Sequence, residues 1–236
     1  MSNTSSAPRT AVLWDIDGTL LRARGAGTRA FTIALEAVTG HAFPSHPIDM
    51  GGNTDPMIAA ALLAAVGVED EAFIAPLLAE VERAYEANEA EFRALTVVQP
   101  GIAAALAELT ALDTVQTIVT GNLESVARRK IAAAGVGIEE HLRFELGAYS
   151  SDHAIRAELV RLARSRIAAA VAPVDPERTW VIGDTPRDFE CARANGVRCI
   201  LVATGTFELS QLDSLGADAV FPDLSDTARL LETMEM

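Results

Sequence analysis

The chain has 236 residues and half of them are hydrophobic, so it can bury a large core and is not expected to be disordered. Its formal net charge of -14 excludes nucleic acid and anionic membrane surfaces as natural partners, because both would repel the chain. The two cysteines, Cys191 and Cys199, are too few for a disulfide framework and lack the paired spacing of a zinc site, which favours a reducing compartment.

The predicted elements begin after a polar segment, residues 1–10, which we expect to form a short loose tail. No apolar run approaches the length that spans a bilayer, so we predict a cytoplasmic protein that does not enter a membrane. Short β-rich apolar runs predict strands at residues 10–14, 115–119, 179–182, 198–202 and 219–221. Ala- and Leu-rich helical patterns separate most of these runs, which is typical of an α/β protein with a Rossmann-like parallel sheet.

The connection between the first two predicted strands is far longer than a crossover helix requires. Most of it has a helical pattern, with helices predicted at residues 26–39, 55–66 and 70–95. We therefore predict an inserted α-helical domain over residues 22–98, and an α/β core domain that consists of residues 1–21 and 99–236.

The first group of polar residues lies at the end of the first predicted strand. Alternation along a strand places Asp15 and Asp17 on one side of the chain and Ile16 on the other. Gly18 then permits a sharp change in backbone direction that a residue with a Cβ would resist. An isolated Asp-x-Asp-Gly is also typical of a solvated acidic turn, so its meaning depends on the other strand ends.

The second group follows the strand predicted at residues 115–119. Thr120 is a hydroxyl at a strand end, and it precedes Gly121 and Asn122, which is able to cap the next helix. Thr120 and the exposed amides of this turn are suited to hold phosphate oxygens. The same three residues are equally typical of an ordinary helix start.

The third group follows the strand predicted at residues 179–182. Asp184 lies at the strand end, Thr185 can cap the following helix, and Pro186 can open it. Asp188 lies near the start of that helix, where the helix dipole stabilises an acid, so Asp188 has an alternative structural explanation. Open α/β sheets place their ligands at such strand ends, and we expect the three groups to converge there.

Convergence would bring Asp15, Asp17, Asp184 and Asp188 together, and each close pair of carboxylates costs on the order of a few kcal/mol. Proton sharing or a divalent cation would relieve this cost, and an all-oxygen ligand set favours magnesium over zinc. The histidines show no ligand spacing and are interpreted as loop or surface residues; they are His41, His46, His141 and His153.

Together the three motifs resemble the haloacid dehalogenase superfamily of phosphohydrolases, over residues 12–202, and its phosphoglycolate phosphatase-like branch in particular. The resemblance implies that Asp15 is the nucleophile and that Asp17 is the general acid and base. It also implies that the Asp15 side chain, the Asp17 backbone carbonyl and the Asp184 side chain bind Mg²⁺, with Asp188 supporting them.

The same resemblance implies that Thr120, together with Gly121 and Asn122, binds the phosphoryl oxygens of the substrate. The inserted helical domain is similar to the family's cap domain, and residues 51–55 look like the cap loop that faces the active site. Four cap residues are weighed as substrate contacts, although each is as easily an ordinary loop residue: His41, His46, Asn53 and Thr54.

The sequence departs from the family at its phosphate-binding lysine, because no Gly-Lys-Pro-like segment precedes the last motif. Arg156 lies at about the right place and is the predicted substitute, since arginine stays charged and grips phosphate with two nitrogens. A solvent-facing arginine is the alternative. Lys130, the single lysine of the chain, is the rival, although its neighbours Arg128 and Arg129 suggest a solvated helix face.

We therefore predict a magnesium-dependent phosphatase that hydrolyses a small phosphorylated metabolite through an aspartyl-phosphate intermediate. A sugar-phosphate mutase on the same scaffold stays open. So does a weakly active relative that binds a phosphorylated ligand or a protein, because arginine replaces the family lysine. Dehalogenation is disfavoured, because that branch needs no metal and typically lacks an acid where Asp17 stands. Phosphoglycolate-like compounds and sugar phosphates are the substrates that the resemblance suggests first.

Overall fold

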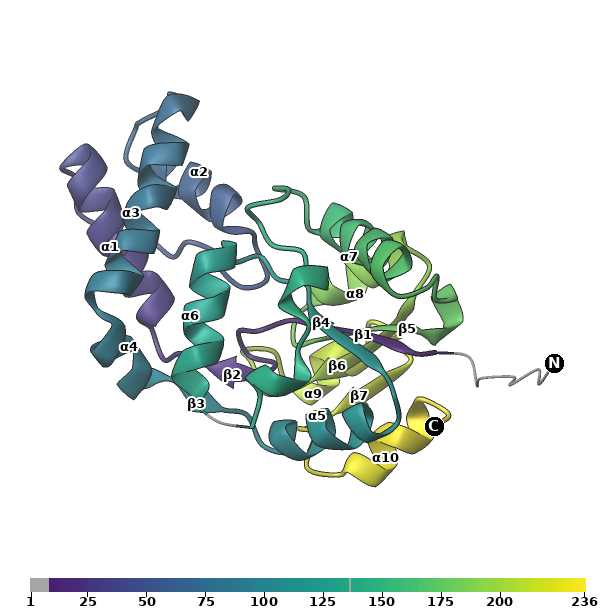
Figure 1. The fold of residues 1–236 in the computed structure, drawn as a ribbon. Helices are drawn as coiled ribbons and strands as arrows, with labels where there is room; N and C mark the ends of the chain where they lie inside the picture. Colours follow the sequence, from purple (N-terminus) through teal and green to yellow (C-terminus); the bar gives the residue numbers. More distant parts are fainter. Residues whose placement is uncertain (1–8, 136) are drawn as a thin grey trace.

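The computed structural model describes residues 9–135 and 137–236, so most of the tail expected at residues 1–10 lies outside the described residues (Figure 1). None of the helices in the described ranges combines the length and the apolar character needed to cross a bilayer.

The central element is a five-stranded sheet with the strand order β4-β1-β5-β6-β7. All neighbouring strands run parallel. The strands are β1 (Ala11–Trp14), β4 (Val115–Ile118), β5 (Thr179–Gly183), β6 (Arg198–Val202) and β7 (Ala219–Phe221). The predicted strands are thus all present, and the predicted α/β fold with a parallel sheet is confirmed.

Alternation along β1 divides the core into two layers. Leu13 contributes to the hydrophobic cluster on one face of the sheet, whereas Val12 and Trp14 contribute to the cluster on the other. All three side chains are fully buried, as expected for a central strand of a parallel sheet that helices cover on both faces. The backbone at the end of β1 is therefore held rigidly on both sides.

Helices of the core domain cover the two faces (Figure 1). Apolar residues of α5 (Ile102–Ala111), α6 (Glu124–Ala134) and α10 (Thr227–Thr233) belong to the Trp14 layer. Apolar residues of α7 (Arg156–Ala170), α8 (Pro186–Ala194) and α9 (Leu209–Asp213) belong to the Leu13 layer. Short 3₁₀ helices of the core domain are η2 (Glu139–His141), η3 (Phe144–Leu146) and η4 (Pro176–Arg178).

The helical insertion forms a separate group at one end of the sheet (Figure 1). It contains α1 (Ala26–Thr39), α2 (Asp55–Ala65), η1 (Glu71–Phe73), α3 (Ile74–Ala87) and α4 (Glu89–Leu95). The chain leaves the core through β2 (Leu21–Arg22) and returns through β3 (Val97–Val98), and these two short strands pair antiparallel. The predicted inserted helical cap is confirmed, and we propose residues 22–98 as its extent.

The helix predicted at residues 70–95 is not continuous. Asn88 separates α3 from α4 with φ -114° and ψ 24°, outside helical geometry. Its side chain donates a hydrogen bond to the Ala84 carbonyl at 2.8 Å, the same carbonyl that accepts from the Asn88 amide at 3.1 Å. The break redirects the chain, so that α4 contacts α6 of the core domain.

Candidate active site

Three neighbouring strands end at the same edge of the sheet. Asp15 follows β1, Thr120 follows β4 and Asp184 follows β5, and these strands lie side by side. The Asp15 amide donates to the Ile182 carbonyl at 3.0 Å, which ties the first strand end to the third. The chain order changes direction at β1, the position where open α/β sheets bind ligands.

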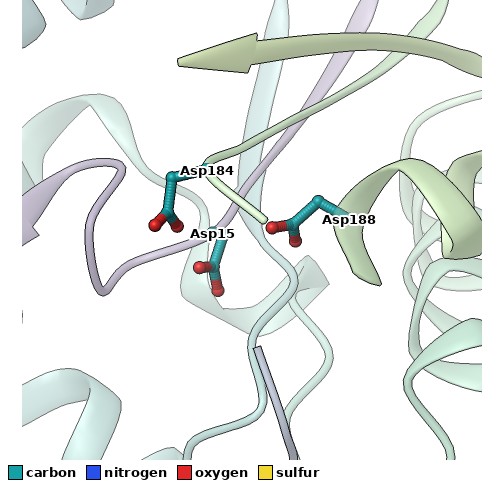
Figure 2. Close-up of side chains that lie close together, drawn as sticks. All are labelled: Asp15, Asp184 and Asp188. Atoms are coloured by element: carbon teal, nitrogen blue, oxygen red, sulfur yellow. The ribbon is translucent and has the colours of Figure 1, made fainter. Parts of the chain in front are cut away.

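Three carboxylates gather at this edge, as Figure 2 shows for Asp15, Asp184 and Asp188. One oxygen atom from each lies within 4.8 Å of the other two, and all three residues are buried. Thr19 donates to Asp184 at 3.3 Å, and Gly18 and Gly205 pack so closely on Asp184 that an added Cβ would overlap it. The structure thus brings these three predicted residues together.

Arg156 lies between two of these carboxylates. Its Nη2 atom is 2.8 Å from Asp15 Oδ1 and 2.5 Å from Asp188 Oδ1, and its Nη1 atom donates to the Gly52 carbonyl at 3.1 Å. Only 8% of the residue is exposed, so the alternative of a solvent-facing arginine is wrong. The guanidinium group partly offsets the charge of the cluster and links it to the cap loop.

Asp188 has two functions in the fold. Its Oδ2 atom accepts hydrogen bonds from the Thr185 amide at 3.0 Å and from the Thr185 hydroxyl at 2.7 Å, which stabilises the start of α8. Its Oδ1 atom pairs with Arg156. The helix-start explanation for Asp188 therefore holds, and it coexists with a place in the acidic cluster.

Lys130 reaches the site from α6, contrary to the interpretation that it belongs to a solvated face. Its Nζ atom is 2.5 Å from Asp17 Oδ2 and 2.8 Å from Asn122 Oδ1, and the residue is 6% exposed. Burial, the largest single effect, would lower the pKa of Lys130, but Asp17, Tyr85 and Asp55 together outweigh burial and raise it. Lys130 is therefore a charged group inside the site.

The expectation that Asn122 caps the following helix is wrong. Helix α6 begins at Glu124, and the Asn122 side chain accepts from Lys130 instead. The first helical amide, Glu124, donates to the Ser151 hydroxyl at 2.9 Å. Asp55 of the cap bonds to the turn before the helix: its Oδ2 atom accepts from the Leu123 amide at 2.8 Å, while the Asp55 amide donates to the Gly121 carbonyl at 2.7 Å. The cap is thus anchored on the turn that holds Thr120.

Burial makes ionisation of the clustered carboxyl groups costly. It raises the pKa of Asp15 to about 6, although the Arg156 guanidinium opposes the shift. Burial, followed by the neighbouring carboxylates of Asp188 and Asp15, raises the pKa of Asp184 well above its usual range. The one arginine therefore does not compensate the whole cluster, and a further cation would be stabilised there.

The donor set fits magnesium. Asp15 and Asp184 offer buried carboxylate oxygens, the ligand type that Mg²⁺ prefers, and no imidazole is among the described residues that line the cavity. The Cys191 sulfur lies beside Asp188, but burial raises the pKa of its thiol to about 12, so it is not a thiolate ligand. Asp188 already accepts from Thr185 and Arg156, so it is suited to a supporting position.

A cavity of about 420 Å³ joins the carboxylates to the cap. Eight residues were predicted for catalysis, substrate binding or metal binding, and all of them except Asp188 line this cavity. The seven that line it are Asp15, Asp17, Thr120, Gly121, Asn122, Arg156 and Asp184. Of the four cap residues weighed as substrate contacts, Asn53 lines the cavity, whereas His41, His46 and Thr54 do not. The Thr54 hydroxyl instead donates to the Ala154 carbonyl at 2.7 Å.

Sequence reasoning kept Lys130 only as the rival of Arg156, placed Asp55 only as part of the cap loop at residues 51–55, and missed Tyr85. A stronger signal existed for Lys130, because it shares the buried stripe of α6 with Val126 and Ile131, at helical spacing. Tyr85 gave none, since its proximity to the site depends on how the cap docks.

The comparisons agree with this geometry. Residues 12–193 match the family described as haloacid dehalogenase-like hydrolase. No curated protein sequence matches the chain.

Several solved structures share the fold. A hydrolase from Pseudomonas syringae has a TM-score of 0.72 at 20% identity, with 95% of this chain and 98% of that chain covered. A predicted phosphatase from Clostridium acetobutylicum has a TM-score of 0.70 at 16% identity, covering 96% and 100%. A β-phosphoglucomutase from Clostridium difficile has a TM-score of 0.71 at 12% identity, covering 96% and 97%.

Proposed function

Because the chain belongs to the haloacid dehalogenase-like hydrolase family, we propose that it is a magnesium-dependent phosphatase that hydrolyses a small organic phosphomonoester through an aspartyl-phosphate. The observation that carries the proposal is the position of Asp15. Its carboxylate lies in the cavity beside Asp184 and Arg156, so a nucleophile, a cation site and a fixed positive charge meet at one point.

In the first half of the proposed reaction, an Asp15 oxygen attacks phosphorus in line with the departing alcohol. Arg156 offsets charge on the equatorial oxygens, while the Thr120 hydroxyl and the amides of Gly121 and Asn122 bind them. Magnesium, held by Asp15, Asp184 and the Asp17 carbonyl, would supply charge neutralisation at the phosphoryl group.

Asp17 exchanges protons in both halves of the proposed reaction. Lys130 already occupies Oδ2 of Asp17, so we assign the proton to Oδ1. Asp17 first protonates the leaving oxygen and then takes a proton from the water that hydrolyses the Asp15 phosphate. Lys130 is a positioning residue in this scheme, because its buried ammonium group holds one oxygen of the partly exposed Asp17 carboxylate.

The test is phosphate release from a panel of small phosphomonoesters, measured with Mg²⁺ and with EDTA. We expect magnesium-dependent release, and a loss of at least about 10³-fold in Asp15→Asn with an unchanged circular dichroism spectrum. Asp213→Asn is the matched control, because Asp213 is an exposed carboxylate on α9. Substantial phosphate release by Asp15→Asn would contradict the proposal. Isomer formation without phosphate release would show that the protein transfers the phosphoryl group to a second substrate hydroxyl and not to water.

A further inference from the structure

The cap wall of the cavity is mainly apolar. Phe31 of α1, Ile58 of α2, and Val81 with Tyr85 of α3 line the cavity opposite the carboxylates. Each of these four residues is at most 4% exposed. Val81 and Tyr85 are four residues apart and so present one face of α3. These four side chains offer one hydrogen-bonding group to a substrate, the Tyr85 hydroxyl, while Arg24, Thr28 and Asn53 are polar cap residues that also line the cavity.

Tyr85 is the exception in this wall. Its hydroxyl group is buried, has Lys130 as its charged neighbour, and makes no hydrogen bond of good geometry among the described residues, so its proton is left without an acceptor. The ring is fixed by an edge-on contact with Phe92, with the ring centres 4.8 Å apart, and the Lys130 ammonium lies 5.7 Å from the Tyr85 ring centre. Burial raises the pKa of Tyr85 to about 12, so the hydroxyl keeps its proton and can donate. Buried polar groups normally have partners, so an unpartnered hydroxyl in a cavity points to a ligand.

We infer that the substrate is the phosphomonoester of a mainly apolar alcohol that carries one further hydroxyl group. The Tyr85 hydroxyl binds that further hydroxyl group, and this inference rests on the proposed function. The apolar part of the alcohol packs on Phe31, Ile58 and Val81. Tyr85 is then a specificity-determining residue of the cap.

Two polar groups near this wall are already engaged. Lys130 pairs with Asp17 and Asn122, and Asp55 accepts from the Leu123 amide. A sugar phosphate would bring several hydroxyl groups against Phe31, Ile58 and Val81, where most would lose their hydrogen bonds to water without replacement. This apolar part of the wall therefore disfavours sugar phosphates and favours a single, well-placed hydroxyl.

The experiment compares two series of probes, alkyl phosphates and ω-hydroxyalkyl phosphates with two to six carbons, together with glucose 6-phosphate. At one chain length we expect the hydroxyl to raise kcat/KM about 10-fold over the plain alkyl probe, which corresponds to one well-made hydrogen bond. Glucose 6-phosphate is expected to have a lower kcat/KM than that best probe. In Tyr85→Phe, the ratio of kcat/KM for the hydroxylated probe to kcat/KM for the plain alkyl probe should fall to about one.

Tyr149→Phe is the matched control, because Tyr149 is the other tyrosine of the chain and its buried hydroxyl donates to the Phe144 carbonyl, away from the cavity. It should keep the ratio of the natural protein. A ratio that persists in Tyr85→Phe, or a higher kcat/KM for glucose 6-phosphate, would overturn the inference and leave the phosphatase standing. If Tyr85→Phe does not fold, the ranking of the probes by kcat/KM in the natural protein still tests the inference. Phosphate release from none of the probes would overturn the proposed function, and this inference with it.

Discussion

Arg156 carries the positive charge that two buried carboxylates share. One nitrogen contacts both Asp15 and Asp188, and a second nitrogen reaches the Gly52 carbonyl of the cap. A lysine has a single nitrogen, so it can supply the charge but not the contact with the cap at the same time. Arginine at this position therefore couples the charge of the site to the position of the cap loop.

We expect Arg156→Met to reduce kcat/KM at least about 100-fold and to lower the free energy of unfolding by roughly 3–5 kcal/mol, because two buried carboxylates lose their partner. Arg156→Lys should restore most of the stability and only part of the activity. Phosphate release and urea unfolding measure the two effects. Arg161→Met is the control, because Arg161 is an exposed arginine on the same helix. Equal activity of Arg156→Lys and the natural protein would show that the contact with the cap contributes nothing.

Asp55 makes stability depend on pH. Burial raises its pKa from 3.8 to about 6 in the folded protein. The folded protein thus binds the proton more tightly than the unfolded chain does, so stability is lost as the pH rises from about 4 to above 6. The free energy of unfolding falls by roughly 3 kcal/mol, because each unit of pKa difference between the folded and unfolded states corresponds to about 1.4 kcal/mol.

Asp55→Asn removes this ionisation while keeping an oxygen that can accept from the Leu123 amide. We expect the variant to gain stability relative to the natural protein between pH 4 and pH 7, by up to roughly 3 kcal/mol. Urea unfolding at several pH values measures the difference. Asp213→Asn is the control, because it makes the same substitution at an exposed carboxylate. A pH-independent difference for Asp55→Asn would show that the Asp55 carboxylate is not destabilised by burial.

At the level of elements, the loop after β6 controls the shape of the acidic cluster. Gly205 lies in this loop, and an added Cβ would overlap Asp184 Oδ2. We expect Gly205→Ala to displace Asp184 and to weaken Mg²⁺ binding at least about 10-fold, since a misplaced ligand costs about 1.4 kcal/mol or more. Isothermal titration with Mg²⁺ measures this, with the circular dichroism spectrum as the test of folding. An unchanged Mg²⁺ affinity would show that Asp184 is not a ligand of the metal.

The strand ends were predictable from the sequence because each carries its own local signal. The alternation before Asp15 marks the end of a strand, and Thr185 with Pro186 marks the start of a helix. The break at Asn88 was not predictable, because alanine-rich helix patterns continue on both sides of it. Helix pattern alone does not reveal a side chain that competes for a backbone carbonyl.

Contacts between distant segments could not be predicted from any one segment. Asp55 of the cap bonds to the Leu123 amide although 68 positions separate the two residues, and the packing of the cap on the core brings them together. Lys130 reaches Asp17, which is 113 positions away, through packing within the core domain. Such pairs have no periodicity or spacing that a sequence shows.

For the whole molecule, the cap loop is closely held to the core. Arg187 of α8 contacts the Gly51 carbonyl and the Asp49 carboxylate, both at 2.7 Å. The amide of Asp55 and the hydroxyl of Thr54 add two further hydrogen bonds across the same boundary. The described arrangement therefore corresponds to a cap closed over the carboxylates, in which bulk water is largely excluded from Asp15.

The net charge of -14 and the buried carboxylates together predict how the whole protein responds to magnesium. Binding to the folded state alone stabilises it, by about 2.7 kcal/mol at a concentration of 100 times Kd. For a chain of this size we expect Tm to rise by roughly 5–10 °C with Mg²⁺ and to return with EDTA.

Asp184→Asn separates this site from general screening of the acidic surface. The variant should be more stable than the natural protein without magnesium, because it removes one charge from a crowded set, and it should lose most of the magnesium-dependent rise in Tm. Thermal unfolding in NaCl of matched ionic strength reports the screening alone, which acts on both proteins equally. If Asp184→Asn and the natural protein showed the same rise in Mg²⁺, the carboxylates at the ends of β1 and β5 would not form the metal site.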